Sequence, residues 1–171
     1  MSFEEFIKAK QEKAGKKPPF DKESRIKEFK GYVEWFYDQL ENLWLAGYFD
    51  SLQPRFEDIT IREELLGDYQ VRALTLTVGD DEIHFKPFGT MLIGSCGRID
   101  VACGDHKARF IMVGEKARTP QALFVISING EKPPKRDYGK LVWKLVDERG
   151  MMSFVDLTPD VIQRLIMKLA E

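Results

Sequence analysis

All cysteine and histidine residues of this chain lie in one short stretch, from His84 to His106. Tetrahedral zinc sites use thiolates and imidazoles, so His84, Cys96, Cys103 and His106 are the first candidates for chemistry. Their spacings match no familiar zinc finger or ribbon, and the strand register predicted below sends His84 to the far face of its own hairpin. We therefore expect no metal site and no cofactor. Cys103 then becomes a small core residue, His106 a strand-end residue and Cys96 a loop thiol.

Cys96 is also the candidate nucleophile of an enzyme. A cysteine hydrolase needs a thiolate beside a general base, and only His84 and His106 could supply that base. Nothing in the sequence brings either histidine to Cys96. The chain also lacks a glycine-rich phosphate loop, a Gly-x-Ser-x-Gly turn and a His-Glu-x-x-His helix. An enzyme using Cys96 with a histidine is thus an alternative to a non-catalytic protein.

A basic cluster points to a different chemistry. Its members are predicted on the polar face of one hairpin and in the loop that follows it: Arg98, Lys107, Arg109, Lys116 and Arg118. Such a patch could hold a phosphate group or a nucleic-acid backbone. Asp100 neutralises part of it, and no aromatic side chains alternate with the cations on that face. A nucleic-acid or nucleotide binder is therefore a second alternative, and a solvated strand face with cross-strand ion pairs is favoured.

Composition is that of an ordinary globular protein. Of 171 residues, 43% are hydrophobic and 32% charged, and the net charge is −2, so no overall field would draw the chain to nucleic acid or anionic lipid. The apolar runs are too short to span a bilayer, and the first residues lack the pattern of a secretion signal. We predict a cytoplasmic protein without a membrane partner. Residues 34–68 nevertheless carry nine acidic and two basic side chains, whereas residues 1–30 carry nine basic and six acidic ones.

The elements that would position these residues begin with a helical N-terminal arm, residues 1–17. Ser2 and Glu5 have the spacing of a capping box, and the helix should end near Gly15. Phe3 and Phe6 give it a small apolar patch that could dock on a partner protein or on a second copy of the chain. The two prolines that follow block continuation of the helix. Residues 18–171 are predicted to form a single α+β domain.

A long helix is predicted from Asp21 to Tyr48. Its apolar residues recur in steps of three and four and should face a sheet: Ile26, Phe29, Val33, Phe36, Leu40 and Leu43. Tyr32 and Trp35 form a second row beside this stripe. Either the arm covers these two aromatics, or they are exposed for a partner.

From Asp58 onward the apolar pattern has a period of two. A turn at Gly67-Asp68 pairs Ile61 with Leu74, and a turn at Asp80-Asp81 pairs Leu76 with Phe85. A third turn, at Gly104-Asp105, pairs residues 99 with 110, 100 with 109 and 101 with 108. Further strands are expected at 91–94, 123–128, 141–146 and 152–157, and Thr158 should cap a C-terminal helix.

The sequence thus predicts an α+β fold with an antiparallel sheet of about eight strands that is covered by the two helices. The sheet is built from hairpins and is either open or curled into a half-barrel. For function it favours a non-catalytic protein-binding module of the immunity, adaptor or regulatory type. The predicted partner-binding residues are Phe3, Phe6, Tyr32 and Trp35.

Overall fold

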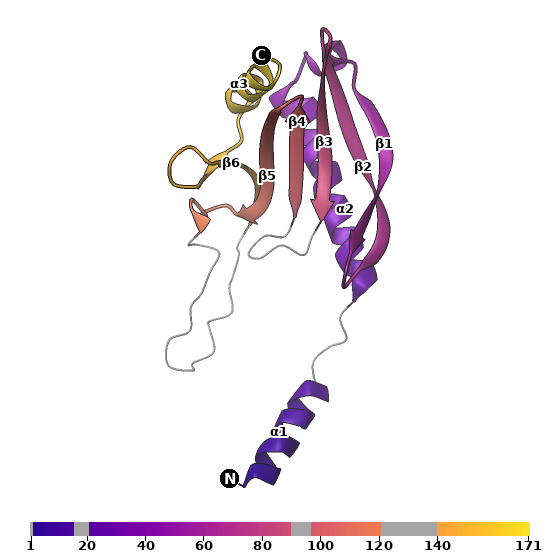
Figure 1. Ribbon diagram of the computed structural model, residues 1–171, viewed down its shortest axis with the longest axis vertical. Helices are drawn as coiled ribbons and strands as arrows, with labels where there is room; N and C mark the ends of the chain where they lie inside the picture. The colour runs from indigo at the N-terminus through magenta and orange to yellow at the C-terminus, as the bar shows by residue number, and fades with distance from the viewer. Residues whose placement is uncertain (1, 16–20, 90–96, 121–139) are drawn as a thin grey trace.

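Capping residues begin all three helices of the computed structural model, which describes residues 2–15, 21–89, 97–120 and 140–171. In α1 (Phe3–Gly15), the Glu5 backbone N–H donates to the Ser2 hydroxyl and the Ser2 N–H donates to the Glu5 carboxylate, which confirms the predicted capping box. Asp21 caps α2 (Lys22–Gln39) through the Ser24 N–H. Thr158 caps α3 (Pro159–Leu169), as predicted. Figure 1 shows α1 apart from the remainder of the chain.

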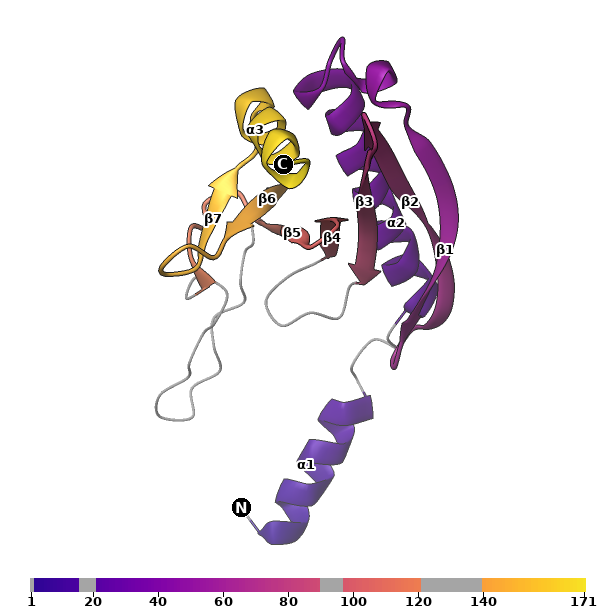
Figure 2. The same ribbon diagram turned by 45° about the horizontal axis from the view of Figure 1, so that its top comes forward.

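Seven strands in the described part of the chain form one open, fully antiparallel sheet in sequential order. They are β1 (Arg55–Glu63), β2 (Gly67–Val78), β3 (Asp81–Gly89), β4 (Arg98–Cys103), β5 (His106–Gly114), β6 (Leu141–Asp147) and β7 (Ser153–Asp156). This confirms the α+β class. The prediction was about eight strands, and the segments 91–94 and 123–128 lie outside the described residues. Figure 2 shows β6 and β7, with α3 above them, turned away from β1–β3.

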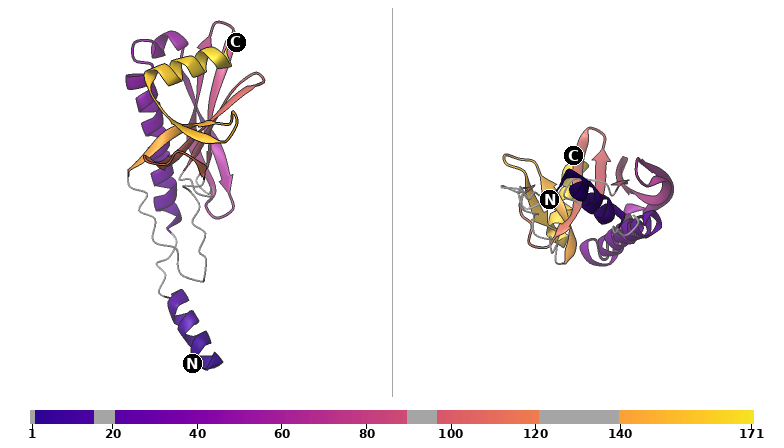
Figure 3. Two further views of the ribbon diagram at one scale, coloured as in Figure 1. Left: turned by 90° about the vertical axis from the view of Figure 1, so that its left-hand side faces the viewer. Right: turned by 90° about the horizontal axis from the view of Figure 1, so that it is seen from below.

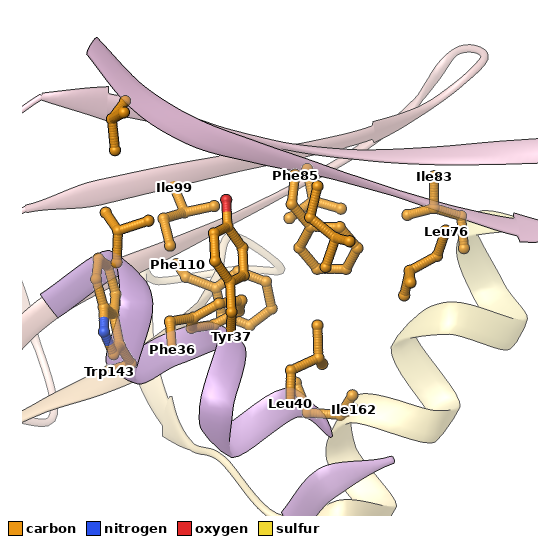
Figure 4. Close-up of a cluster of buried hydrophobic side chains, with 14 of the residues drawn as sticks. Phe36, Tyr37, Leu40, Leu76, Ile83, Phe85, Ile99, Phe110, Trp143 and Ile162 are labelled. Atoms are coloured by element: carbon orange, nitrogen blue, oxygen red, sulfur yellow. The ribbon is translucent and has the colours of Figure 1, made fainter. Parts of the chain in front are cut away.

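The core lies between the sheet and the two helices α2 and α3, whose positions are seen in Figure 3. Phe36 of α2 is at its centre. Its ring centroid lies 4.9 Å from that of Phe110 and 5.5 Å from that of Trp143. Figure 4 shows these rings with Leu76, Ile83 and Phe85 from the sheet and Ile162 from α3. Because aromatic rings from three regions of the chain meet here, this cluster fixes α2 to the sheet.

The end of the long helix differs from the prediction. After Gln39 the chain forms a π-helical turn, η1 (Leu40–Trp44), closed by a hydrogen bond from the Leu45 N–H to the Leu40 carbonyl oxygen. The wider turn rotates the following residues around the helix axis. Leu43 is therefore 54% exposed, and Trp44 is buried in its place. Gly47 then adopts a positive φ of 84°, as expected for a helix end.

The predicted register of the first hairpin is wrong. Ile61 pairs with Tyr69 rather than with Leu74, because the chain turns over residues 64–66 and β2 already begins at Gly67. The side chain of Leu66 is buried, which holds this wider turn against the core.

The second register is wrong by two residues, since Leu76 pairs with Ile83 rather than with Phe85. The turn uses Gly79, whose φ is 62°, because a two-residue hairpin turn needs positive φ. A shift by two keeps the predicted residues on the core face.

The predicted register of the β4–β5 hairpin and the predicted last strand pair are confirmed. Ile99 pairs with Phe110, Asp100 with Arg109 and Val101 with Ala108, around a turn in which Gly104 has φ 56°. β6 and β7 form the predicted last pair. No helix among the described residues is both long enough and apolar enough to cross a membrane.

Candidate functional site

The β4–β5 hairpin places Arg98, Lys107 and Arg109 on its outer face, as the predicted register requires. Two of these cations, Arg98 and Arg109, already form ion pairs. The Arg98 guanidinium donates to both carboxylate oxygens of Asp100, at 2.6 and 2.9 Å, and lies over the Phe88 ring at 4.3 Å. Arg109 lies 3.7 Å from Asp100 and 3.6 Å from Glu148. Lys107 forms no ion pair with any described residue.

Lys116 and Arg118 do not join this cluster. They follow the opposite end of β5, whereas Lys107 and Arg109 lie near its start. The Arg118 guanidinium donates to Asp156 on β7, at 3.1 Å, and to the Glu115 carbonyl oxygen. The structure thus divides the predicted nucleic-acid-binding set into two groups. Binding of nucleic acid by either group stays a prediction.

A groove of about 1020 Å³ lies between the β4–β5 hairpin, the β6–β7 hairpin and one side of α3. Six cations line it against three carboxylates: Arg98, Lys107, Arg109, Arg149, Arg164 and Lys168 against Asp100, Asp147 and Glu148. Hydrogen bonds from the side chain and backbone of Arg149 lower the pKa of Asp147 to about 2, so this carboxylate stays ionised and paired.

The groove lies at a break in the sheet. β5 pairs with β6 only from Phe110 to Gly114, although β6 continues to Asp147 beside β7. The first four residues of β5 therefore have β4 on one side and no described strand on the other. Within this region the Arg109 Nε atom is buried and meets no hydrogen-bond acceptor in the described part of the chain. Sequence reasoning missed the α3 side of this groove, because no local pattern relates α3 to β5.

The cysteine and histidine residues are only partly brought together. Cys103 is buried and pairs with His106 across the hairpin. Burial raises the pKa of the Cys103 thiol, and the nearby Asp81 carboxylate adds to this shift, which disfavours the thiolate needed for nucleophilic attack. His84 lies on the outer face, 3.0 Å from the Thr75 hydroxyl. Cys96 lies outside the described residues, so its proposed role as a nucleophile stays a prediction.

Among the described residues, no group of three or more His, Cys, Asp or Glu side chains could hold a metal ion.

Lys144 is the one buried lysine of the described structure, and the sequence analysis did not single it out. It pairs with Ile111, on the opposite face of the sheet from Trp143 and the core. Its Nζ atom donates to the carbonyl oxygens of Glu115 and Ala117, at 2.6 and 2.7 Å, and lies 3.1 Å from Asp156. An ammonium group has three donors; two form hydrogen bonds here, and the Asp156 carboxylate pairs with the charge. Lys144 therefore fixes the loop after β5 to β6 and β7. A lysine inside the apolar run 141–146 was the signal available in the sequence.

The predicted partner-binding residues fall into two classes. Phe3 and Phe6 of α1 are 78% and 46% exposed, and Ile7 beside them is also exposed. Tyr32 and Trp35 of α2 are partly buried and pack against the core. The Tyr32 hydroxyl donates to Glu28, and its carbonyl oxygen accepts the Trp143 indole N–H at 2.9 Å. The largest exposed apolar area among the four predicted residues is therefore on α1.

Comparison of the chain with family models, with curated proteins and with solved structures found no match.

Proposed function

We propose that this protein is a non-catalytic cytoplasmic protein-binding module, of the immunity, adaptor or regulatory type, and that α1 carries its main contact surface. The observation that carries the proposal is the exposure of Phe3, Phe6 and Ile7 on one face of α1. Residues spaced by three and four lie together on a helix, so these side chains make a continuous apolar patch. Exposed apolar patches of this kind are characteristic of interaction sites.

The length of α1 adds support. An isolated helix of 13 residues is only marginally stable in water, because its few hydrogen bonds barely offset the cost of nucleation. Docking of the Phe3, Phe6 and Ile7 face into an apolar groove would supply the missing burial. This is the helix-in-groove mode of recognition, in which residues spaced by three and four serve as anchors.

The charges around the patch indicate the partner's chemistry. Lys10 lies over the Phe6 ring, with its Nζ atom 5.7 Å from the ring centroid. Lys8 directly follows Ile7, and Glu4 and Glu5 lie in the first turn of α1 beside Phe3 and Phe6. An apolar groove whose rim carries both acidic and basic groups would complement this surface. Tyr32 and Trp35 are too deeply packed to be the main anchors, but their exposed edges could extend the contact.

Affinity capture from an extract of the cells that produce this protein tests the proposal. The bait is the full chain, compared with a Phe3→Ser/Phe6→Ser variant and with a Met151→Ser control that alters an exposed apolar residue in the β6–β7 turn. We expect a stoichiometric protein partner that the control retains and that the α1 variant loses by at least about tenfold.

Light scattering of the purified chain is run in parallel, because the partner could be a second copy. A dimer that the α1 variant dissociates would identify that partner. Equal capture by the α1 variant and the control, or no stoichiometric partner together with a monomeric chain, would refute the proposal.

A further inference from the structure

The open edge of β5 offers a binding surface that is separate from α1. Before Phe110, β5 does not pair with β6, and His106 to Arg109 pair only with β4 among the described strands. The Met112 N–H donates to Gly97, next to β4, so even-numbered residues of β5 direct their backbone groups toward β4. Backbone groups alternate along an antiparallel strand, and those of Lys107 and Arg109 therefore point toward the groove.

The groove beside this edge favours a negatively charged occupant. Its lining has a net charge of about +3, with His106 neutral, although the whole chain is at −2. Lys107 and Lys168 lie on different sides of the groove, and neither has a described carboxylate within ion-pair distance, although the charge of Lys168 acts on Asp147. The buried Arg109 Nε atom forms no hydrogen bond with a described residue and lies 3.7 Å from the Asp100 carboxylate.

The lining is also partly apolar on the α3 side, where Ala108, Leu145, Val155 and Leu165 are partly exposed. An extended peptide directs alternate side chains to opposite sides. A peptide on the β5 edge could therefore place apolar side chains against this lining and acidic side chains on the outer face beside Lys107, while Lys168 adds positive charge from α3.

We propose that the free edge of β5 binds an extended, acidic peptide segment of a partner protein as an added β-strand in the groove beneath α3. The backbone of Lys107 and Arg109 supplies the strand pairing, and the cations of the β4–β5 hairpin and α3 select acidic side chains. Nucleic acid fits less well. Single-stranded nucleic acid is usually held by aromatic stacking, and none of the residues lining this groove is Phe, Tyr or Trp.

This surface does not depend on the proposed role of α1, so the two proposals can fail separately. The test is fluorescence anisotropy with the full chain and a short dye-labelled peptide of alternating glutamate and valine. We expect saturable binding that weakens as salt is raised, because exposed charges are screened. Two further peptides separate the contribution of the acidic side chains from that of the backbone hydrogen bonds. One replaces glutamate with lysine, and the other carries N-methyl groups on the backbone nitrogens that would donate to β5. Both should bind at least about tenfold more weakly.

Matched protein variants locate the site. Lys107→Glu/Lys168→Glu should lower the affinity for the acidic peptide at least about tenfold. Lys86→Glu/Lys140→Glu changes the net charge by the same amount at exposed lysines that do not line the groove, and should leave the affinity within about threefold. The Phe3→Ser/Phe6→Ser variant should bind the peptide like the wild-type chain.

Four outcomes would overturn the proposal. They are no binding of the acidic peptide, equal losses in the two charge-reversal variants, undiminished binding of the N-methylated peptide, and tighter binding of an oligothymidine of equal charge. The last outcome would identify the groove as a nucleic-acid site instead.

Discussion

Replacement of Lys144 by methionine removes the only ammonium group that the described structure buries completely, while leaving a side chain of similar length. The Ala117 carbonyl oxygen loses its donor, and the Glu115 carbonyl oxygen loses one of two donors, since it keeps the Arg118 guanidinium. Asp156 also loses a cation, but its side chain is 58% exposed and keeps the Arg118 guanidinium at 3.1 Å. The change therefore acts mainly on the loop after β5.

The expected loss of stability follows from these contacts. The hydrogen bond to Ala117 is buried, and an unsatisfied buried acceptor costs about 1–3 kcal/mol. The bond to Glu115 is only partly buried, so water can replace the donor at a cost of up to about 1 kcal/mol. The exposed partner Asp156 adds little, because surface ion pairs contribute about 0–1 kcal/mol. We expect Lys144→Met to lower the free energy of unfolding by about 1–4 kcal/mol.

Urea denaturation monitored by tryptophan fluorescence measures this effect. With a denaturant slope of about 2 kcal/mol per molar, the midpoint should fall by roughly 0.5–2 M. Lys86→Met is the matched control, since Lys86 is an exposed lysine of β3 and its replacement should change stability by less than about 0.5 kcal/mol. An unchanged midpoint for Lys144→Met would show that the two carbonyl oxygens do not depend on the lysine, and would refute this reasoning.

Two further predictions concern α2 and its continuation. Leu40 is buried and the π-helical turn leaves Leu43 exposed, so Leu40→Ala should cost about 2–5 kcal/mol and Leu43→Ala less than about 0.5 kcal/mol in urea denaturation. Equal losses would contradict the exposure of Leu43 by the π-helical turn. Burial raises the pKa of the Tyr37 phenol above its ordinary value of 10.0, and the nearby Glu34 carboxylate raises it further. The folded state then binds this proton more tightly than the unfolded state, so the contribution to stability is complete below pH 10 and is lost as the pH rises above it. Tyr37→Phe should therefore make the urea midpoint less sensitive to pH above 10, whereas the same alkaline loss in wild type and variant would assign it to other groups.

Local features of the fold were predictable because their causes are local. The caps at Ser2, Asp21 and Thr158 depend on residues within three positions, and the β4–β5 register follows from one glycine turn and alternating side chains. The register of the first hairpin was predicted wrongly for a different reason. Leu66 is buried by contacts distant in sequence, and this widens the turn. Leu43 was predicted to be buried because the sequence pattern indicates a continuous α-helix. No residue type in the sequence marks the π-helical turn.

The features of the candidate binding surfaces also divide into those that follow from local sequence and those that depend on the tertiary structure. The sequence by itself determined the apolar face of α1 and the shared face of Arg98, Lys107 and Arg109, since helix and hairpin periodicity place those residues together. Only the tertiary structure decided that Lys144 is buried, that Tyr32 and Trp35 pack on the core, and that α3 brings Lys168 to the open edge of β5. These outcomes depend on where the sheet bends and where β5 leaves β6. Such bending results from the packing of the whole core and has no signature in a short stretch of residues.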